Sequence, residues 1–215
     1  MRNIFLLGLF TLISLACNHV EANKRIKATT VISQNSEEFI CNYSLFKSES
    51  QKLLEQYRSD PTLSNKEKFL YQVRDSLFTC WLGTPWDFNG TTEQPNNGTI
   101  ACGYFVTTLL RDMGFKLNRI RLAQCASEEM IKTVCIRNTL YRSSNEPIIK
   151  FVEKINEPGL YVVGLDFHTG FILNDGDNKY FIHANYAGNK AVEKQIAVES
   201  SVLASSKYKV IGKVI

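Results

Sequence analysis

The hydrophobic period of the chain changes near residue 159, and this change limits the folds open to it. Three segments before it have apolar residues at helical spacing. They are residues 36–58, 64–82 and 102–113. Three segments after it read as strands. They are residues 159–165, 169–173 and 179–184. Helices first and antiparallel strands afterwards predict an α+β fold.

Short sequence motifs predict where several of these helices begin or end. Ser64–Glu67 matches a capping box and predicts a helix start at Ser64, and Gly83 is a natural stop for that helix. Gly114 ends a helix whose first turn contains Cys102. We also expect a helix over residues 122–136, irregular or weakly helical structure over 137–158 and a last strand over 208–214.

The first residues of the chain predict an export signal. The apolar run 4–16 is too short to span a bilayer and suits a signal peptide. It ends in Ser14–Cys17, which looks like a bacterial lipobox and favours a lipidated Cys17. Cleavage after Ala22 by ordinary signal peptidase is the alternative. We expect a protein of the bacterial cell envelope or periplasm, with membrane contact only through this lipid anchor.

Chain length and net charge limit the number of domains and the kinds of binding partner that we expect. The 215 residues suffice for one domain with a real core. We expect a signal and tether over residues 1–22, a helical element over 23–82 and a catalytic domain over 83–215. The net charge of +4 is mild and scattered, with no basic stripe of interleaved aromatics, which argues against nucleic acid.

The number of cysteines raises the question of which of them form disulfides. Cys17 belongs to the signal, and five others follow it. These are Cys41, Cys80, Cys102, Cys125 and Cys135. Outside the cytoplasm an odd number leaves at least one thiol unpaired. We favour a Cys125–Cys135 pair, while pairing of Cys102 stays open. The absence of a Cys-x-x-Cys pair argues against a zinc ribbon, and we expect no metal.

Cys102 has a distinctive position. The first turn of a helix has unsatisfied N–H groups and partial positive charge, which stabilise a thiolate and lower its pKa. Gly103 would let a substrate approach the backbone. A free cysteine often only fills space in a core. Its place in the first turn nevertheless favours a nucleophile.

Two histidines are predicted to face each other. Of the three in the chain, His19 lies in the lead-in, which leaves His168 and His183. A hairpin centred on Asp175-Gly176 places these two directly opposite on one face, with Cβ atoms about 5 Å apart. The alternative for each is a half-buried structural ring. Their mutual pairing favours a shared role.

Four stretches of the chain resemble the NlpC/P60 family of papain-like cysteine peptidases, in the family's order. They are Gly-Thr-Pro-Trp (83–86), Ala-Cys-Gly-Tyr-Phe-Val (101–106), His-Thr-Gly-Phe-Ile (168–172) and Phe-Ile-His-Ala (181–184). The family usually has Asp-Cys-Ser-Gly-Phe around its nucleophile. Ala-Cys-Gly-Tyr-Phe here indicates a divergent branch.

The resemblance implies a papain-like core with helices packed on an antiparallel sheet. It implies Cys102 as nucleophile, His168 as general base and His183 as the residue that orients the base. Trp86 stands where the family usually has a tyrosine that lines the site. The other expected substrate contacts are Asp87, Gly103 and Tyr104. No cofactor is implied.

The predicted function is an exported cysteine hydrolase. It would cleave amide bonds in peptidoglycan stem peptides through a Cys-His-His triad and a thioester, and we expect a monomer. Two alternatives stay open. One is a non-catalytic envelope binding protein on the same fold, and the other is a papain-like amidase or acyltransferase with a different acyl substrate. The loop 89–99 either walls the cleft or is simply solvated.

Overall fold

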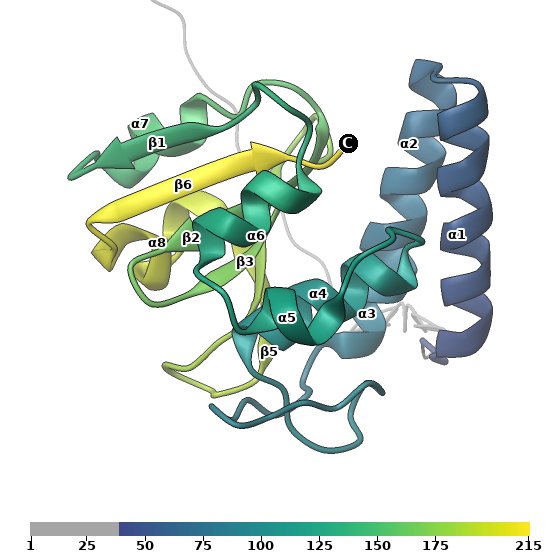
Figure 1. Ribbon diagram of the computed structural model, residues 1–215, viewed down its shortest axis with the longest axis horizontal. Coiled ribbons are helices and arrows are strands. Elements are labelled where there is room, and N and C mark those ends of the chain that lie inside the picture. Colours follow the sequence, from purple (N-terminus) through teal and green to yellow (C-terminus); the bar gives the residue numbers. More distant parts are fainter. Residues whose placement is uncertain (1–38) are drawn as a thin grey trace, which may run out of the picture. The chain divides into compact units, whose positions relative to one another are not determined.

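The computed structural model describes residues 39–215 (Figure 1). It is an α+β fold with a six-stranded antiparallel sheet in the order β1-β6-β2-β3-β4-β5. The strands are β1 (Tyr141–Ser144), β2 (Gly159–Leu165), β3 (Thr169–Asn174), β4 (Lys179–Ala184), β5 (Val192–Ile196) and β6 (Tyr208–Lys213). The change of period therefore predicted the class correctly.

Helices occupy most of the chain before the sheet. The first group is α1 (Tyr43–Ser59), α2 (Leu63–Gln72), a π-helical turn η1 (Val73–Leu77) and α3 (Phe78–Trp81). Next come α4 (Cys102–Asp112), α5 (Arg119–Ala123) and α6 (Ser127–Val134). Between the strands lie α7 (Ile148–Glu153), which follows β1, and a 3₁₀ turn η2 (Ala197–Glu199) and α8 (Ser201–Ser205), which precede β6.

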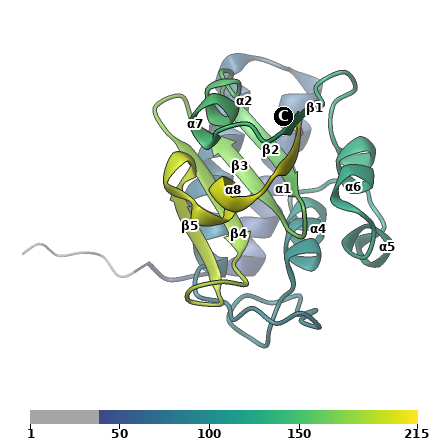
Figure 2. The same ribbon diagram turned by 90° about the vertical axis from the view of Figure 1, so that its left-hand side faces the viewer.

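Two apolar clusters pack on the two faces of the sheet. Alternate residues of a strand point to opposite faces. Accordingly Leu160 and Val162 pack with α1–α6, whereas Tyr161 and Val163 pack with α7, η2 and α8. Figure 1 shows α1 and α2 standing together on one side of the unit, and Figure 2 shows α5 and α6 at the margin away from β5.

The upstream helices share the main core. Phe78 of η1–α3 meets Phe171 of β3 edge to face at 5.2 Å between ring centroids, and Phe105 of α4 meets the same ring at 5.9 Å. A disulfide between Cys41 and Cys80 ties the start of α1 to α3. Residues 39–82 are thus a segment of this core, with no separate core of their own among the described residues.

Several helix boundaries differ from the expectation. Thr62, not Ser64, caps α2, because its side chain accepts a hydrogen bond from the N–H of Asn65 at 3.3 Å. The expected helix over residues 122–136 is two helices, α5 and α6, separated at Gln124–Ala126. Gly83 and Gly114 end their helices with positive φ, as predicted.

Two edge strands were missed. β1 lies in the stretch predicted to be irregular, and β5 lies beyond the last residue assigned to the hairpin. Both have polar sequences, Tyr-Arg-Ser-Ser and Val-Glu-Lys-Gln-Ile, as edge strands commonly do. Their apolar content is too low for a strand pattern to stand out.

Candidate active site

Cys102 is the first residue of α4, as predicted. Ala101 before it is extended, and its carbonyl accepts the N–H of Phe105 at 2.8 Å, which starts the helix. The apolar stripe of α4 is fully buried and fixes the helix on the sheet. The helix therefore presents Cys102 at a defined point. Figures 1 and 2 show the long loop that precedes α4 beside this helix.

Gly103 was expected to let a substrate approach the backbone. It also allows two helices to pack closely. A Cβ on this residue would lie 2.2 Å from the carbonyl oxygen of Ala123. Only glycine lets the start of α4 come this close to the end of α5. Gly103 also lines the cleft next to Cys102.

A cleft of about 480 Å³ opens at the start of α4. It contains Trp86, Cys102, Gly103 and Tyr104, together with His168. Other lining residues include Phe88, Asn89, Thr91, Gln124, Phe167 and Tyr186. A second cavity, of about 220 Å³, also contains Cys102 and His168. The predicted nucleophile and the predicted base therefore line the same two spaces.

The two histidines are in contact, although not directly opposite. His168 Nε2 lies 2.8 Å from His183 Nδ1, and the ring planes are inclined by 78°. The hairpin pairs Asn174 with Lys179, so its loop is centred one residue later than predicted. Gly176, with φ of +104°, occupies this four-residue loop.

This shift puts Gly170 across from His183. A Cβ on Gly170 would lie 2.8 Å from the Cβ of His183, so glycine leaves the space that the imidazole needs. His168 lies two residues before Gly170, just outside β3. It reaches His183 along the diagonal of the same face, a distance that long side chains and rings can span. The expectation of a directly opposite pair was wrong, and the expectation of a shared face was right.

Burial sets the charge state of the site. His168 is 5% exposed and His183 is fully buried, and burial lowers the pKa of both imidazoles below 6.5. Burial also raises the pKa of the Cys102 thiol, against backbone N–H groups of Thr169 and Gly103 that act to lower it. The expected lowering of this pKa was wrong because burial outweighs the first turn of the helix. At neutral pH both partners are uncharged.

The start of β3 lies close to the start of α4, where Cys102 is located. Thr169 is the residue directly after His168, and it lines the second cavity together with Cys102. The start of α4 and the start of β3 therefore meet at this cavity. In this way Cys102 and Thr169, which are 67 positions apart along the chain, are brought together.

Three residues behind His183 were missed by sequence analysis. Glu193 Oε1 lies 3.3 Å and Gln195 Nε2 lies 2.9 Å from His183 Nε2. Asn185 donates to the same Glu193 oxygen at 2.7 Å. Glu193 and Gln195 share a face of β5 because they are two residues apart in a strand. A prediction of that strand from the sequence would therefore have placed both residues near His183.

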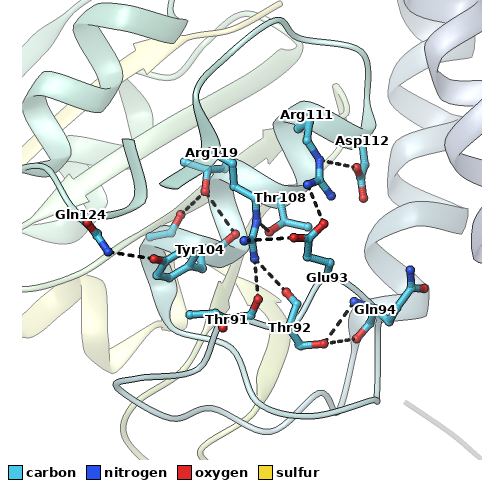
Figure 3. Close-up of polar contacts among 12 residues, drawn as sticks. Thr91, Thr92, Glu93, Gln94, Tyr104, Thr108, Arg111, Asp112, Arg119 and Gln124 are labelled. Atoms are coloured by element: carbon cyan, nitrogen blue, oxygen red, sulfur yellow. Dashed lines mark hydrogen bonds and ion pairs between the residues drawn. The ribbon is translucent and has the colours of Figure 1, made fainter. Parts of the chain in front are cut away.

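A buried arginine fixes the loop at the cleft, as Figure 3 shows. Arg119 of α5 is 9% exposed and donates to Thr108 of α4 at 2.7 Å. It also donates to the carbonyls of Thr91 and Thr92 at 2.8 and 3.0 Å. Its guanidinium lies 4.8 Å from the centre of the Tyr104 ring. Part of the loop 89–99 is thus a fixed wall of the cleft, and sequence analysis missed Arg119.

Of the other predicted substrate contacts, two line the cleft and one does not. The Trp86 ring lies in the cleft and is 6.3 Å from the ring of Tyr186. Tyr104 lies there too, and its hydroxyl accepts from Gln124 at 3.0 Å. Asp87 is exposed and does not line the cleft. Its carboxylate accepts from the N–H of Asn89 at 2.8 Å and holds a turn. Cys17, the predicted lipidation site, lies outside the described residues.

The predicted Cys125–Cys135 disulfide does not form. The two thiols lie in separate places, one in the break between α5 and α6 and the other after α6. Cys41 and Cys80 pair instead, which leaves Cys102 a free thiol. Within residues 39–215, no group of three potential ligands is arranged to hold a metal ion, and no helix is long and apolar enough to cross a membrane.

The comparisons with known proteins give no match. No model of a known protein family matches the chain, and no curated protein matches it significantly.

Proposed function

We propose that the protein is a cysteine hydrolase in which Cys102, His168 and His183 act as a triad. The observation that carries this proposal is the joint placement of the three side chains. Cys102 and His168 line one cleft, and His168 is hydrogen-bonded to His183. A nucleophile, a base and a group that orients the base are the parts that thiol catalysis needs.

The hydrogen bond to His183 decides which nitrogen acts as base. Nε2 of His168 is engaged with His183, so Nδ1 is the nitrogen left for Cys102. Because thiol and imidazole are both neutral at rest, the proton moves from sulfur to Nδ1 as the sulfur attacks the carbonyl carbon. The backbone N–H of Cys102, together with Trp86, is proposed to stabilise the oxyanion.

The remaining steps release the amine and then hydrolyse the thioester. The protonated His168 gives its proton to the leaving amine, and a thioester remains on Cys102. His168 then takes a proton from water, and the hydroxide equivalent attacks the thioester. The acid product leaves, and the proton returns to sulfur.

We propose a papain-like core of the NlpC/P60 type and a peptidoglycan stem peptide as substrate. The four quoted sequence stretches, the predicted export signal and the placement of Cys102 and His168 in one cleft, with His183 hydrogen-bonded to His168, support this assignment. We further propose that the mature protein lies in the bacterial envelope, held by a lipid on Cys17, and acts as a monomer.

The test is digestion of purified muropeptides. The wild type is expected to release new amine termini, detected by mass spectrometry, and Cys102→Ser and His168→Asn are expected to release none. Cys135→Ser is a matched control for loss of a free thiol, because Cys135 lines neither cavity, and it is expected to be fully active. No cleavage by the wild type, together with no covalent labelling of Cys102, would favour a non-catalytic binding protein.

One observation favours a second candidate, an amidase or acyltransferase with another acyl substrate. The cleft is lined by aromatic rings, and no carboxylate, lysine or arginine is among its described lining residues. Phe167 is 96% and Phe88 is 79% exposed at its rim. Such a surface suits an uncharged or apolar acyl group.

A substrate panel separates the two candidates. N-acyl amides and esters of increasing chain length are incubated with the wild type and with Cys102→Ser. Turnover that rises with chain length, in an enzyme that leaves muropeptides intact, would support the second candidate. Muropeptide cleavage with no turnover of the panel would support the first.

A further inference from the structure

Two side chains of β5 compete for one nitrogen of His183. β5 places Glu193 directly opposite His183, and Gln195 follows on the same face. Glu193 Oε1 lies 3.3 Å and Gln195 Nε2 lies 2.9 Å from His183 Nε2. Two amides hold the carboxylate there, since Asn185 and Gln195 donate to the same oxygen at 2.7 and 3.0 Å. The carboxylate can only accept a hydrogen bond and the amide nitrogen can only donate one.

The choice between these partners fixes the tautomer of both rings. A neutral imidazole has one proton. If Gln195 donates to His183 Nε2, the proton of His183 is on Nδ1 and points to His168 Nε2. The proton of His168 is then on Nδ1. That nitrogen cannot take the proton of Cys102, so this arrangement is inactive.

The carboxylate produces the opposite arrangement. If His183 donates from Nε2 to Glu193, its Nδ1 is free to accept from His168 Nε2. His168 Nδ1 then has a lone pair for Cys102. When His168 takes the thiol proton, both of its nitrogens have hydrogens, and His183 Nδ1 must accept. Only the arrangement that uses Glu193 fits this protonated state.

We propose that Glu193 is a positioning residue that selects the active tautomer of the histidine pair, and that Gln195 opposes it. This inference rests on the proposed function, since it concerns which nitrogen serves as base. Glu193 acts through His183 and does not touch the substrate. Asn185 keeps its carboxylate in place.

The experiment compares two truncations on one strand. Glu193→Ala is expected to lower kcat/KM by at least about tenfold, since the wrong tautomer is costly in related triads. Gln195→Ala removes the competing donor. It also removes one of the two amides on Glu193, but the shorter hydrogen bond from Asn185 still holds the carboxylate, so kcat/KM is expected to rise a few-fold. Lys194→Ala, an exposed residue on the other face of the same strand, is the control and is expected to have no effect. Thermal melting of each variant reports whether it is folded.

A second readout does not depend on turnover. Nitrogen-15 spectra of the imidazole rings report which ring nitrogen has the proton, and single His→Asn variants assign the signals. In the wild type at pH 7, His183 is expected to be protonated on Nε2, and in Glu193→Ala on Nδ1. An unchanged tautomer in folded Glu193→Ala overturns the inference. So does a kcat/KM within twofold of wild type, or an equal fall in Gln195→Ala.

The two readouts separate two kinds of failure. If the wild type hydrolyses none of the substrates tried, the proposed function fails while the spectra still decide the role of Glu193. If hydrolysis is observed and the tautomer does not respond to Glu193, the triad stands and this inference falls.

Discussion

Folding stability is expected to fall steeply between pH 7 and pH 5 because two histidines are buried without charge. The folded-state pKa values of His168 and His183 lie below the unfolded value of about 6.5, and burial is the cause. Below pH 6.5 the unfolded chain therefore binds protons that the folded protein does not. The stabilising contribution is complete above pH 6.5 and is lost as pH falls toward the folded-state values.

The size of the loss follows from the two side chains. Each uncharged histidine contributes a slope approaching about 1.4 kcal/mol per pH unit once its unfolded form is fully protonated. From pH 7 to pH 5 the pair together loses about 4 kcal/mol. This is a large part of the stability of an ordinary domain, which is about 5–15 kcal/mol.

Urea denaturation followed by tryptophan fluorescence at pH 7, 6 and 5 measures the effect, since Trp81 is fully buried. The double variant His168→Asn with His183→Asn cancels contributions from all other groups when it is compared with the wild type. We expect a wild-type slope steeper by roughly 2 kcal/mol per pH unit over this range. Equal slopes for the two proteins would refute the argument that both rings are buried and neutral.

Three further predictions concern the scaffold of the site. Replacing both Cys41 and Cys80 with alanine removes a cross-link over 39 residues and is expected to lower the free energy of unfolding in urea by about 4 kcal/mol relative to the oxidised wild type, and the reduced wild type is expected to match the variant. Gly103→Ala places a methyl group 2.2 Å from the Ala123 carbonyl, and we expect loss of activity with a lower melting temperature; an unchanged melting temperature would contradict this. Arg119→Met frees the carbonyls of Thr91 and Thr92, so KM should rise several-fold with a smaller change in kcat, whereas an unchanged KM would mean that this loop does not contact substrate.

The sequence predicted those parts of the fold that depend on local pattern. The stripe of α4 and its stop at Gly114 follow from helical spacing and from the need for positive φ. The placement of Cys102 at the start of that helix follows from the same spacing, whereas the pairing of its thiol stayed open until Cys41 and Cys80 were found paired. The order of helices and strands gave the α+β class because each element has its own period.

Other features depend on contacts that are remote along the chain. The hairpin register is set by the turn geometry around Gly176, and an error of one residue there moved the expected partner of His183 from Gly170 to His168. The raised pKa of Cys102 reflects burial by several elements at once, which spacing does not reveal. Glu193 lies on a polar edge strand and could be placed only once that strand was known.

The central claim is that His168 serves as the base for Cys102. Alkylation by iodoacetamide at pH 7.5, quantified peptide by peptide with mass spectrometry, tests it most directly because Cys125 and Cys135 are reference thiols within the same molecule. We predict that His168→Asn slows alkylation of Cys102 by at least about tenfold and leaves the rates of the two references unchanged. An equal Cys102 rate in wild type and variant, with both proteins folded, would contradict the account.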